Sequence, residues 1–216
     1  MINWILPTID QYLSRLQFAV MERIILKRIN SHLQLYKIIN PNQFGFLKNH
    51  STTTQLLSSF NEWYKAILDN NCIDCIYIDY KKAFDSVPIK FLLYKLSNIE
   101  IKGKLLRWIS EFLTNRSAKV RIKDKFSHSF LILSGVPQGS ILGPVLFLIY
   151  INDLPTILPE SIHVRLYADD LKIFHIYKKL GDTKDLQLAF NKVITWSSSW
   201  ALKISPSKTL VFHIGN

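Results

Sequence analysis

The sequence is poor in cysteine, glycine and proline, and it has no long hydrophobic run. Its 216 residues include two cysteines, seven glycines and eight prolines. This composition excludes collagen-like and low-complexity chains. The longest apolar run, at residues 145–151, is far too short to span a bilayer, which takes about 20 apolar residues. The N-terminus also lacks the basic-then-apolar pattern of a signal peptide, so we expect no membrane partner.

Cys72 and Cys75 are the only cysteines. Their spacing is that of half a zinc site or of a redox pair, but the sequence has no second pair and no histidine placed to complete a site. We interpret both as reduced thiols at the start of a strand. Without a disulfide framework, the composition indicates a reducing, intracellular compartment.

Acidic residues are scarce relative to basic ones, with 16 Asp and Glu against 27 Lys and Arg and a net charge of +11. This excess suits a polyanionic partner such as nucleic acid or an acidic membrane, although lysines that only keep the surface soluble would give the same number. Alternation in the densest basic stretch would put four cations on one side of a strand, namely Lys119, Arg121, Lys123 and Lys125. That face could follow a phosphate backbone or be the solvated side of an edge strand.

Apolar spacing divides the chain into helices and strands in mixed order. Helices are predicted at residues 9–35, 52–69, 103–115, 142–154 and 186–202, and another begins at Pro88. Strands are predicted at residues 72–79, 163–167, 171–176 and 210–214, with a hairpin from residues 118–123 and 127–133 and a loop at residues 41–51. Strands that pair locally beneath helices indicate an α+β architecture.

Three aspartates are candidates for metal chemistry. Asp79 ends one predicted strand, and Asp169 and Asp170 lie at the tip of a predicted hairpin. If the strand and the hairpin are neighbours in one sheet, the three carboxylates meet at one edge. Clustered acids are costly unless a cation is present, and carboxylate oxygens suit Mg²⁺. Two such ions can hold the attacking and leaving oxygens of a displacement at phosphorus. The alternative is that the Asp-Asp pair only makes a polar turn.

Several longer segments occur in order and are more specific than the Asp-Asp pair. They are QFGFLKNHSTT at residues 43–53, DYKKAFDSV at residues 79–87, SGVPQGSILGP at residues 134–144, YADD at residues 167–170 and LKISPSKTLVF at residues 202–212. Together they resemble the motifs of reverse transcriptases from non-LTR (LINE-type) retrotransposons. The resemblance covers most of the chain, from about Val20 to Gly215.

The resemblance implies a right-hand polymerase fold. Its palm would be a ferredoxin-like antiparallel sheet with helices on one face, joined to fingers. One reverse transcriptase domain would then cover residues 1–216, with fingers at about 1–75 and 100–134 and palm at about 76–99 and 135–216. We expect the thumb to be missing, no endonuclease or RNase H segment to be present, and the isolated chain to be weak or inactive as a polymerase.

The implied activity is that of an RNA-directed DNA polymerase in retrotransposition. It would join dNTPs to a DNA primer on an RNA or DNA template, with two Mg²⁺ ions or Mn²⁺ in their place. The expected partners are the RNA template, the DNA primer and dNTPs, and the expected location is the nucleus and cytoplasm. The oligomeric state stays open. The alternative is an inactive or truncated remnant that at most binds nucleic acid.

Related polymerases fit the motifs less well. Viral RNA-dependent RNA polymerases usually have Gly before the two acids and a polar group at the sugar gate, whereas this chain has Ala168 and Phe84. Group II intron maturases share much of the motif set, but the Ile-Asn-Asp-Leu and His-Ser-Thr-Thr segments are closer to the LINE type.

The resemblance also implies roles for individual residues. Asp79 and Asp169 would ligate both metals with help from Asp170. Lys208 would lie near the leaving pyrophosphate, where a cation stabilises developing charge or gives up a proton. Phe84 would be the steric gate that excludes a ribose 2′-hydroxyl, and its alternative is a plain core residue.

Further residues are expected to bind the incoming nucleotide, namely Tyr80, Gln138, Gly139 and Lys48. Lys48 follows Leu47, which stands where the family often has an arginine that can contact the triphosphate. Gly135 and Gly139 would allow close backbone approach to a ligand. We expect Asp85 and Asp153 to do only local work in turns or helix caps.

Overall fold

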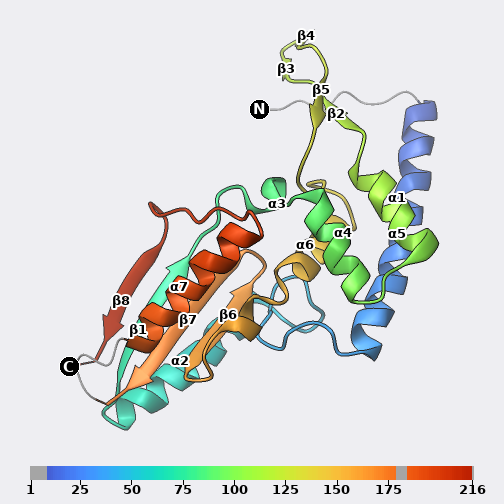
Figure 1. Ribbon diagram of the computed structural model, residues 1–216. Helices are drawn as coiled ribbons and strands as arrows, with labels where there is room; N and C mark the ends of the chain where they lie inside the picture. Colours follow the sequence, from blue (N-terminus) through green and yellow to red (C-terminus); the bar gives the residue numbers. More distant parts are fainter. Residues whose placement is uncertain (1–8, 179–183, 216) are drawn as a thin grey trace.

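The chain folds around a four-stranded antiparallel sheet. Figure 1 shows the computed structural model, which describes residues 9–178 and 184–215. The strands lie in the order β6-β7-β1-β8. Their bounds are Cys72–Ile78 for β1, Ile162–Tyr167 for β6, Asp170–Tyr177 for β7 and Leu210–Ile214 for β8. The predicted α+β architecture is therefore confirmed, and each of the four predicted strands is present.

The helices agree with the predicted ones to within a few residues, and α3 and the 3-10 helix η1 are additional. Their bounds are Ile9–Leu35 for α1, Thr52–Leu68 for α2, Ala83–Ser86 for α3, Ile89–Asn98 for α4, Gly103–Leu113 for α5, Gly143–Ile151 for α6, Leu154–Ile157 for η1 and Lys184–Ser199 for α7. Helix α6 is apolar on all sides because it lies inside the core. In the described ranges, no helix has both the length and the apolar character needed to cross a bilayer.

Helices cover both faces of the sheet. On one face, α7 packs with α4 and α6 in the main core. On the other face lies α2 (Figure 1), whose Trp63 packs against Ile73 and Phe174. The helices of the expected palm thus share one face, as the resemblance implies, whereas α2 from the expected fingers covers the second. Two covered faces explain why β1 is buried at most positions rather than at every other one.

The two cysteines are both buried in β1. Burial raises the pKa of the Cys75 thiol to about 12, so that thiol stays protonated and unreactive at neutral pH. No group of three or more potential metal-ligating side chains is found within residues 9–178 and 184–215. A packing role for the cysteines agrees with these observations.

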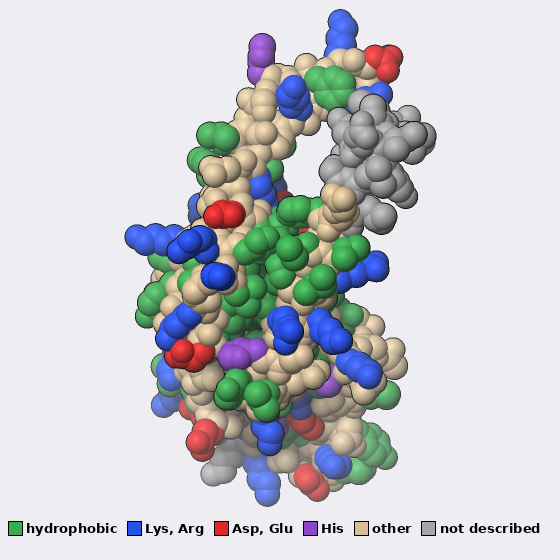
Figure 2. All heavy atoms as spheres, turned by 90° about the vertical axis from the view of Figure 1, so that its right-hand side faces the viewer, with side chains coloured by type: hydrophobic (Ala, Val, Ile, Leu, Met, Phe, Trp, Pro, Cys, Tyr) green, Lys and Arg blue, Asp and Glu red, His purple; other side chains and the backbone are tan. Residues whose placement is uncertain are grey.

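The basic hairpin differs from its prediction. Strand β2 (Arg116–Ala118) pairs with β5 (Phe130–Ile132), and beyond them β3 (Arg121–Ile122) pairs with β4 (Lys125–Phe126). The chain reverses at Lys123, which has a left-handed φ of 55°. Lys125 is therefore on the returning strand, and the four cations do not share one strand face. Figure 2 shows the hairpin standing clear of the body, while other Lys and Arg side chains spread over this side of the molecule.

Asp153 does more than the local work expected of it. Its Oδ1 accepts hydrogen bonds from Lys95 Nζ at 2.6 Å and from Trp196 Nε1 at 3.3 Å. Lys95 is only 6% exposed, and its ammonium lies over the rings of Tyr150, Trp196 and Trp200. Burial lowers the pKa of Lys95 to about 8, although Asp153 opposes the shift. This buried cation joins α4, α6 and α7 on one side of the sheet.

We predict that Lys95→Met removes a pH-dependent part of the stability. Between pH 8 and 10.5 the unfolded chain holds a proton that the folded chain has lost, so the wild-type unfolding free energy rises with pH in this window. The rise relative to Lys95→Met should reach up to about 3 kcal/mol. Urea unfolding across this range measures it, with the exposed Lys104→Met as control. A difference between wild type and Lys95→Met that stays constant with pH would contradict the prediction.

Candidate active site

The acidic residues meet at one end of the sheet because β1 pairs with β7. In that antiparallel pair Ile78 lies opposite Leu171, and one further step brings Asp79 opposite Asp170. Strands β6 and β7 are joined by a two-residue turn, Ala168 and Asp169, which we call the β6–β7 turn. Neighbouring strands lie about 5 Å apart. The predicted strand and hairpin are therefore direct neighbours, and their acids share an edge.

The carboxylates lie in a partly dehydrated, mutually repelling arrangement. Burial raises the pKa of Asp169, and the charges of Asp170 and Asp79 raise it further, while Lys208 lowers it. Burial and Asp79 likewise raise the pKa of Asp170, again against Lys208. These acids hold their protons more tightly than exposed ones do, so a nearby cation would favour their ionised form.

Asp79 offers an oxygen suited to a metal ion. Its Oδ1 is buried and has no hydrogen-bond partner among the described residues. A carboxylate oxygen in this state fits a hard divalent cation, which replaces the missing hydrogen bonds. The described side chains form no cluster of three ligands around one point. The acids would therefore supply part of a coordination shell, and water and substrate oxygens would supply the rest, as is usual for Mg²⁺.

Lys208 lies beside Asp79 because the chain before it extends the sheet past the end of β1. Lys81 N donates to Lys203 O at 2.8 Å, and Ser205 N donates to Asp79 O at 2.8 Å. This pairing leads the segment to Lys208, whose Nζ lies 3.5 Å from Asp79 Oδ2. The side chain of Lys208 is 68% exposed, so the ammonium can still approach a substrate.

A basic cavity of about 600 Å³ opens next to Asp79. Its lining combines four lysines with hydroxyl groups and Asp79 itself: Asp79, Lys81, Lys82, Ser86, Ser134, Ala201, Lys203, Ser205 and Lys208. Lysine ammonium and serine hydroxyl groups are donors suited to phosphate oxygens. Of these four lysines, only Lys208 was predicted from the sequence to lie near the site. The position of Lys81 and Lys82, directly after Asp79 and Tyr80, could have indicated the other side of the cavity.

Phe84 lies between α6 and the loop at residues 41–51. Its ring stacks on Phe147 of α6, with centroids 4.3 Å apart, and meets the edge of Phe46 at 6.1 Å. Its carbonyl accepts a hydrogen bond from Val136 N at 2.9 Å, which fixes the backbone of α3 against the segment leading to Gln138. Phe84 is half-buried, so one part of the ring packs in the core and another faces outward.

Gln138 and Gly139 lie on an exposed loop next to Asp85. Gln138 Nε2 donates to Asp85 Oδ1 at 2.8 Å, so Asp85 holds the predicted nucleotide-binding glutamine instead of capping a helix. Gly139 has a left-handed φ of 80° and open space where a Cβ would be. Gly135 was expected to let a ligand approach the backbone closely. Its close neighbour is instead the protein's own backbone, because a Cβ there would lie 2.7 Å from Asp85 Cα.

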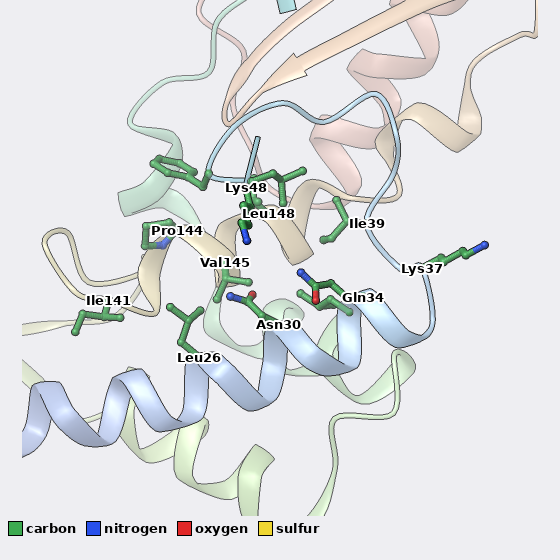
Figure 3. A pocket seen from close by; sticks show the side chains of 13 residues that line it. Leu26, Asn30, Gln34, Lys37, Ile39, Lys48, Ile141, Pro144, Val145 and Leu148 are labelled. Carbon is green, nitrogen blue, oxygen red and sulfur yellow. The ribbon is translucent and has the colours of Figure 1, made fainter. Parts of the chain in front are cut away.

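Two other predicted residues lie apart from the acids. Tyr80 is 3% exposed and packs in the main core, and burial raises the pKa of its hydroxyl. The Tyr80 backbone forms a bridge to Ile204, and Tyr80 does not line the basic cavity. Lys48 lines a separate cavity of about 400 Å³ between the fingers loop (residues 41–51), α1 and α6. Figure 3 shows it there with Asn30 and Gln34 of α1.

Glu22 on α1 supports the loop that carries Gln138 and was not identified from the sequence. It is buried, and its Oε2 accepts hydrogen bonds from Ile141 N at 2.8 Å and Leu142 N at 3.1 Å. These donors lie at the N-terminus of α6, where a carboxylate is also favoured by the helix dipole. A single glutamate in a helix gives no signal of such a distant partner.

Comparison with known proteins agrees with this geometry. Residues 13–214 match the family described as reverse transcriptase (RNA-dependent DNA polymerase). The chain is 29% identical to the probable RNA-directed DNA polymerase from transposon BS of Drosophila melanogaster, over 88% of this chain and 22% of that protein. It is 32% identical to the RNA-directed DNA polymerase from mobile element jockey of the same species, over 88% of this chain and 21% of that protein. The chain thus spans about a fifth of these relatives.

Solved structures show the same fold at low sequence identity. The apo telomerase of Candida tropicalis, truncated from its C-terminal domain, superimposes with a TM-score of 0.65 at 12% identity, over 91% of this chain and 40% of that one. The telomerase of the same yeast in complex with a fragment of telomeric RNA gives 0.65 at 14% identity, over 88% of this chain and 33% of that one. The solved structures thus support the fold, while the family match and the mobile-element relatives show that the chain belongs to the reverse transcriptase family, in its non-LTR retrotransposon branch.

Proposed function

We propose that this chain is the polymerase core of an RNA-directed DNA polymerase. It joins deoxynucleotides to the 3′-hydroxyl of a DNA primer on an RNA template, and it also accepts a DNA template. The observation that carries the proposal is the pairing of β1 with β7, which brings Asp79 opposite Asp170 with Lys208 alongside. The family match and the mobile-element relatives support the same reaction class.

The proposed cofactor is a pair of Mg²⁺ ions, for which Mn²⁺ can substitute. Asp79 and Asp169 would hold both ions, and Asp170 would assist. When bound, the ions supply charge that activates the primer hydroxyl and stabilises the triphosphate. The unpartnered Oδ1 of Asp79 and the raised pKa values of Asp169 and Asp170 support this assignment, because a cation relieves both costs.

The basic cavity suits the triphosphate and the departing pyrophosphate. Lys208 lies at the mouth of the site next to Asp79, and Lys81, Lys82 and Lys203 surround the same space. Ammonium groups placed there stabilise the negative charge that develops on the leaving group, and Lys208 can give it a proton. The site thus combines positively charged lysines, which suit the phosphates, with negatively charged aspartates, which suit the metal ions.

Phe84 is proposed to select deoxynucleotides. Stacking on Phe147 restricts the ring, which therefore cannot move aside for a larger sugar. Gln138, held by Asp85, and the open backbone at Gly139 would border the nascent base pair. Contacts with the template and primer backbones would come from the many lysines and arginines, and such binding weakens as salt rises.

Replacing Asp169 with asparagine should abolish synthesis. We expect wild type to extend a labelled DNA primer on an RNA template with dNTPs and Mg²⁺, at most weakly for a chain without a thumb, and Asp169→Asn to be slower by about 100-fold or more, because a metal ligand is lost. Asp69→Asn is the matched control, since Asp69 is an exposed residue just before the opposite end of β1. Extension by Asp169→Asn at the wild-type rate would contradict the assignment. No extension by wild type would favour a chain that only binds nucleic acid.

The same substitution should stabilise the metal-free protein. Raised pKa values mean that ionising Asp169 and Asp170 lowers the unfolding free energy as the pH rises from about 4 through their folded pKa values. At pH 7 with EDTA, Asp169→Asn should therefore melt at a higher temperature than wild type. Added Mn²⁺ should raise the melting temperature of wild type more than that of the variant. Equal responses to Mn²⁺ in wild type, Asp169→Asn and Asp69→Asn would count against a metal site.

Opening the gate should relax sugar selection. In Phe84→Val the smaller side chain leaves room for a 2′-hydroxyl, so we expect incorporation of ribonucleotides relative to deoxynucleotides to rise by about 10-fold or more. Single-nucleotide extension with matched dNTP and rNTP measures the ratio. Phe130→Val in the exposed hairpin should leave it unchanged. An unchanged ratio in Phe84→Val would show that the ring serves only packing.

A further inference from the structure

Gln43 of the fingers loop is a buried polar residue beside the β6–β7 turn. It is only 2% exposed. Its Oε1 accepts hydrogen bonds from two backbone amides, Gly45 N at 2.7 Å and Ala168 N at 3.0 Å, and its Nε2 lies 3.5 Å from Ala168 O. One side-chain oxygen therefore joins the fingers loop to the residue directly before Asp169.

The loop backbone fixes the position of this side chain. Phe44 N donates to Leu166 O at 2.8 Å, and Leu166 N donates to Asn42 O at 2.9 Å, so Gln43 pairs in parallel with Leu166. The loop thus adds one rung to the sheet at the edge of β6. From that rung the Gln43 side chain reaches past the end of the strand onto the turn.

The β6–β7 turn needs support of this kind. Ala168 has a left-handed φ of 55°, which a residue with a Cβ disfavours. The contact is also close, since a Cβ on Gly45 would lie 2.3 Å from Ala168 N. Only glycine at residue 45 lets the loop reach the turn. The Gln43 oxygen then accepts a hydrogen bond from the backbone amide of Ala168, which is a buried residue.

We propose that Gln43 is a positioning residue that holds the β6–β7 turn so that Asp169 and Asp170 face Asp79. The proposal rests on the proposed function in that the acids are metal ligands. It adds a physical link between the two parts of the site, because the same loop carries Phe46, whose ring meets the gate residue Phe84. A displacement of the loop would then also move the turn that carries Asp169 and Asp170.

A measurement on the wild-type protein tests the hydrogen bonds of Gln43 without any variant. Amide hydrogen exchange followed by NMR should show that the Gly45 and Ala168 amides exchange at least about 10-fold more slowly than exposed turn amides, because both donate to a buried acceptor. Exchange at the rate of an exposed turn would overturn the proposal.

Gln43→Met then separates positioning from packing, because methionine keeps the volume and loses the acceptor. We expect the Ala168 amide to exchange about 10-fold faster and the dissociation constant for Mn²⁺ alone, measured by electron paramagnetic resonance, to rise by about 3-fold or more. Gln55→Met is the matched control, since Gln55 is a buried glutamine on α2. It should leave both readouts unchanged even if it lowers the melting temperature.

The outcomes are distinct. An unchanged Mn²⁺ affinity in Gln43→Met, or an equal shift in Gln55→Met, would show that Gln43 only fills the core. If wild type binds Mn²⁺ and Gln43→Met weakens that binding while neither protein extends a primer, the positioning role stands and the proposed polymerase activity fails.

Discussion

The antiparallel pairing of β1 with β7 is the constraint on which the site depends. A shift of that register by one residue would turn every side chain of β1 to the opposite face and move Asp79 away from Asp170. The register is fixed from both sides, because both faces of the sheet are buried. On one face α2 is anchored through Lys172, whose Nζ donates to Ser59 Oγ at 3.1 Å, and through the ion pair of Arg165 with Glu62. On the other face α7 closes the main core.

Local patterns were enough to predict most elements. Helix α6 was recognisable because its unbroken apolar run agrees with its buried surroundings. Strand β8 was recognisable from its apolar sequence, although Leu210 and Val211 are exposed. The convergence of Asp79 with Asp169 could also be predicted, but only as a consequence of two segments being neighbours in one sheet. The motif order supplied that pairing, since neither segment alone indicates its partner. The hairpin at residues 116–132 was predicted, but the expectation of four cations on one strand face was wrong, because a turn at Lys123 interrupts the alternating pattern.

The residues that hold the site in place were not predictable in the same way. Gln43, Glu22 and Asp153 each use a side chain to reach partners more than forty positions away in the sequence. A single glutamine or glutamate carries no mark of such a contact, so their roles become visible only with the fold. Gly135 shows the same limit, because its need for a bare Cα comes from Asp85, a residue of another segment. Sequence patterns thus indicate the acids proposed to bind metal more readily than the groups that support them.

The site combines features that are each unfavourable in isolation. It gathers three acids with two raised pKa values, leaves Asp79 Oδ1 without a hydrogen bond and holds Ala168 in a left-handed conformation. Such features persist only where surrounding structure determines them. The core of this protein contains the polar side chains of Lys95, Lys172 and Gln43, which are all buried and hydrogen-bonded. Buried polar groups accept few alternative geometries, so they confer rigidity at the edge of the sheet that carries the acids proposed to bind metal.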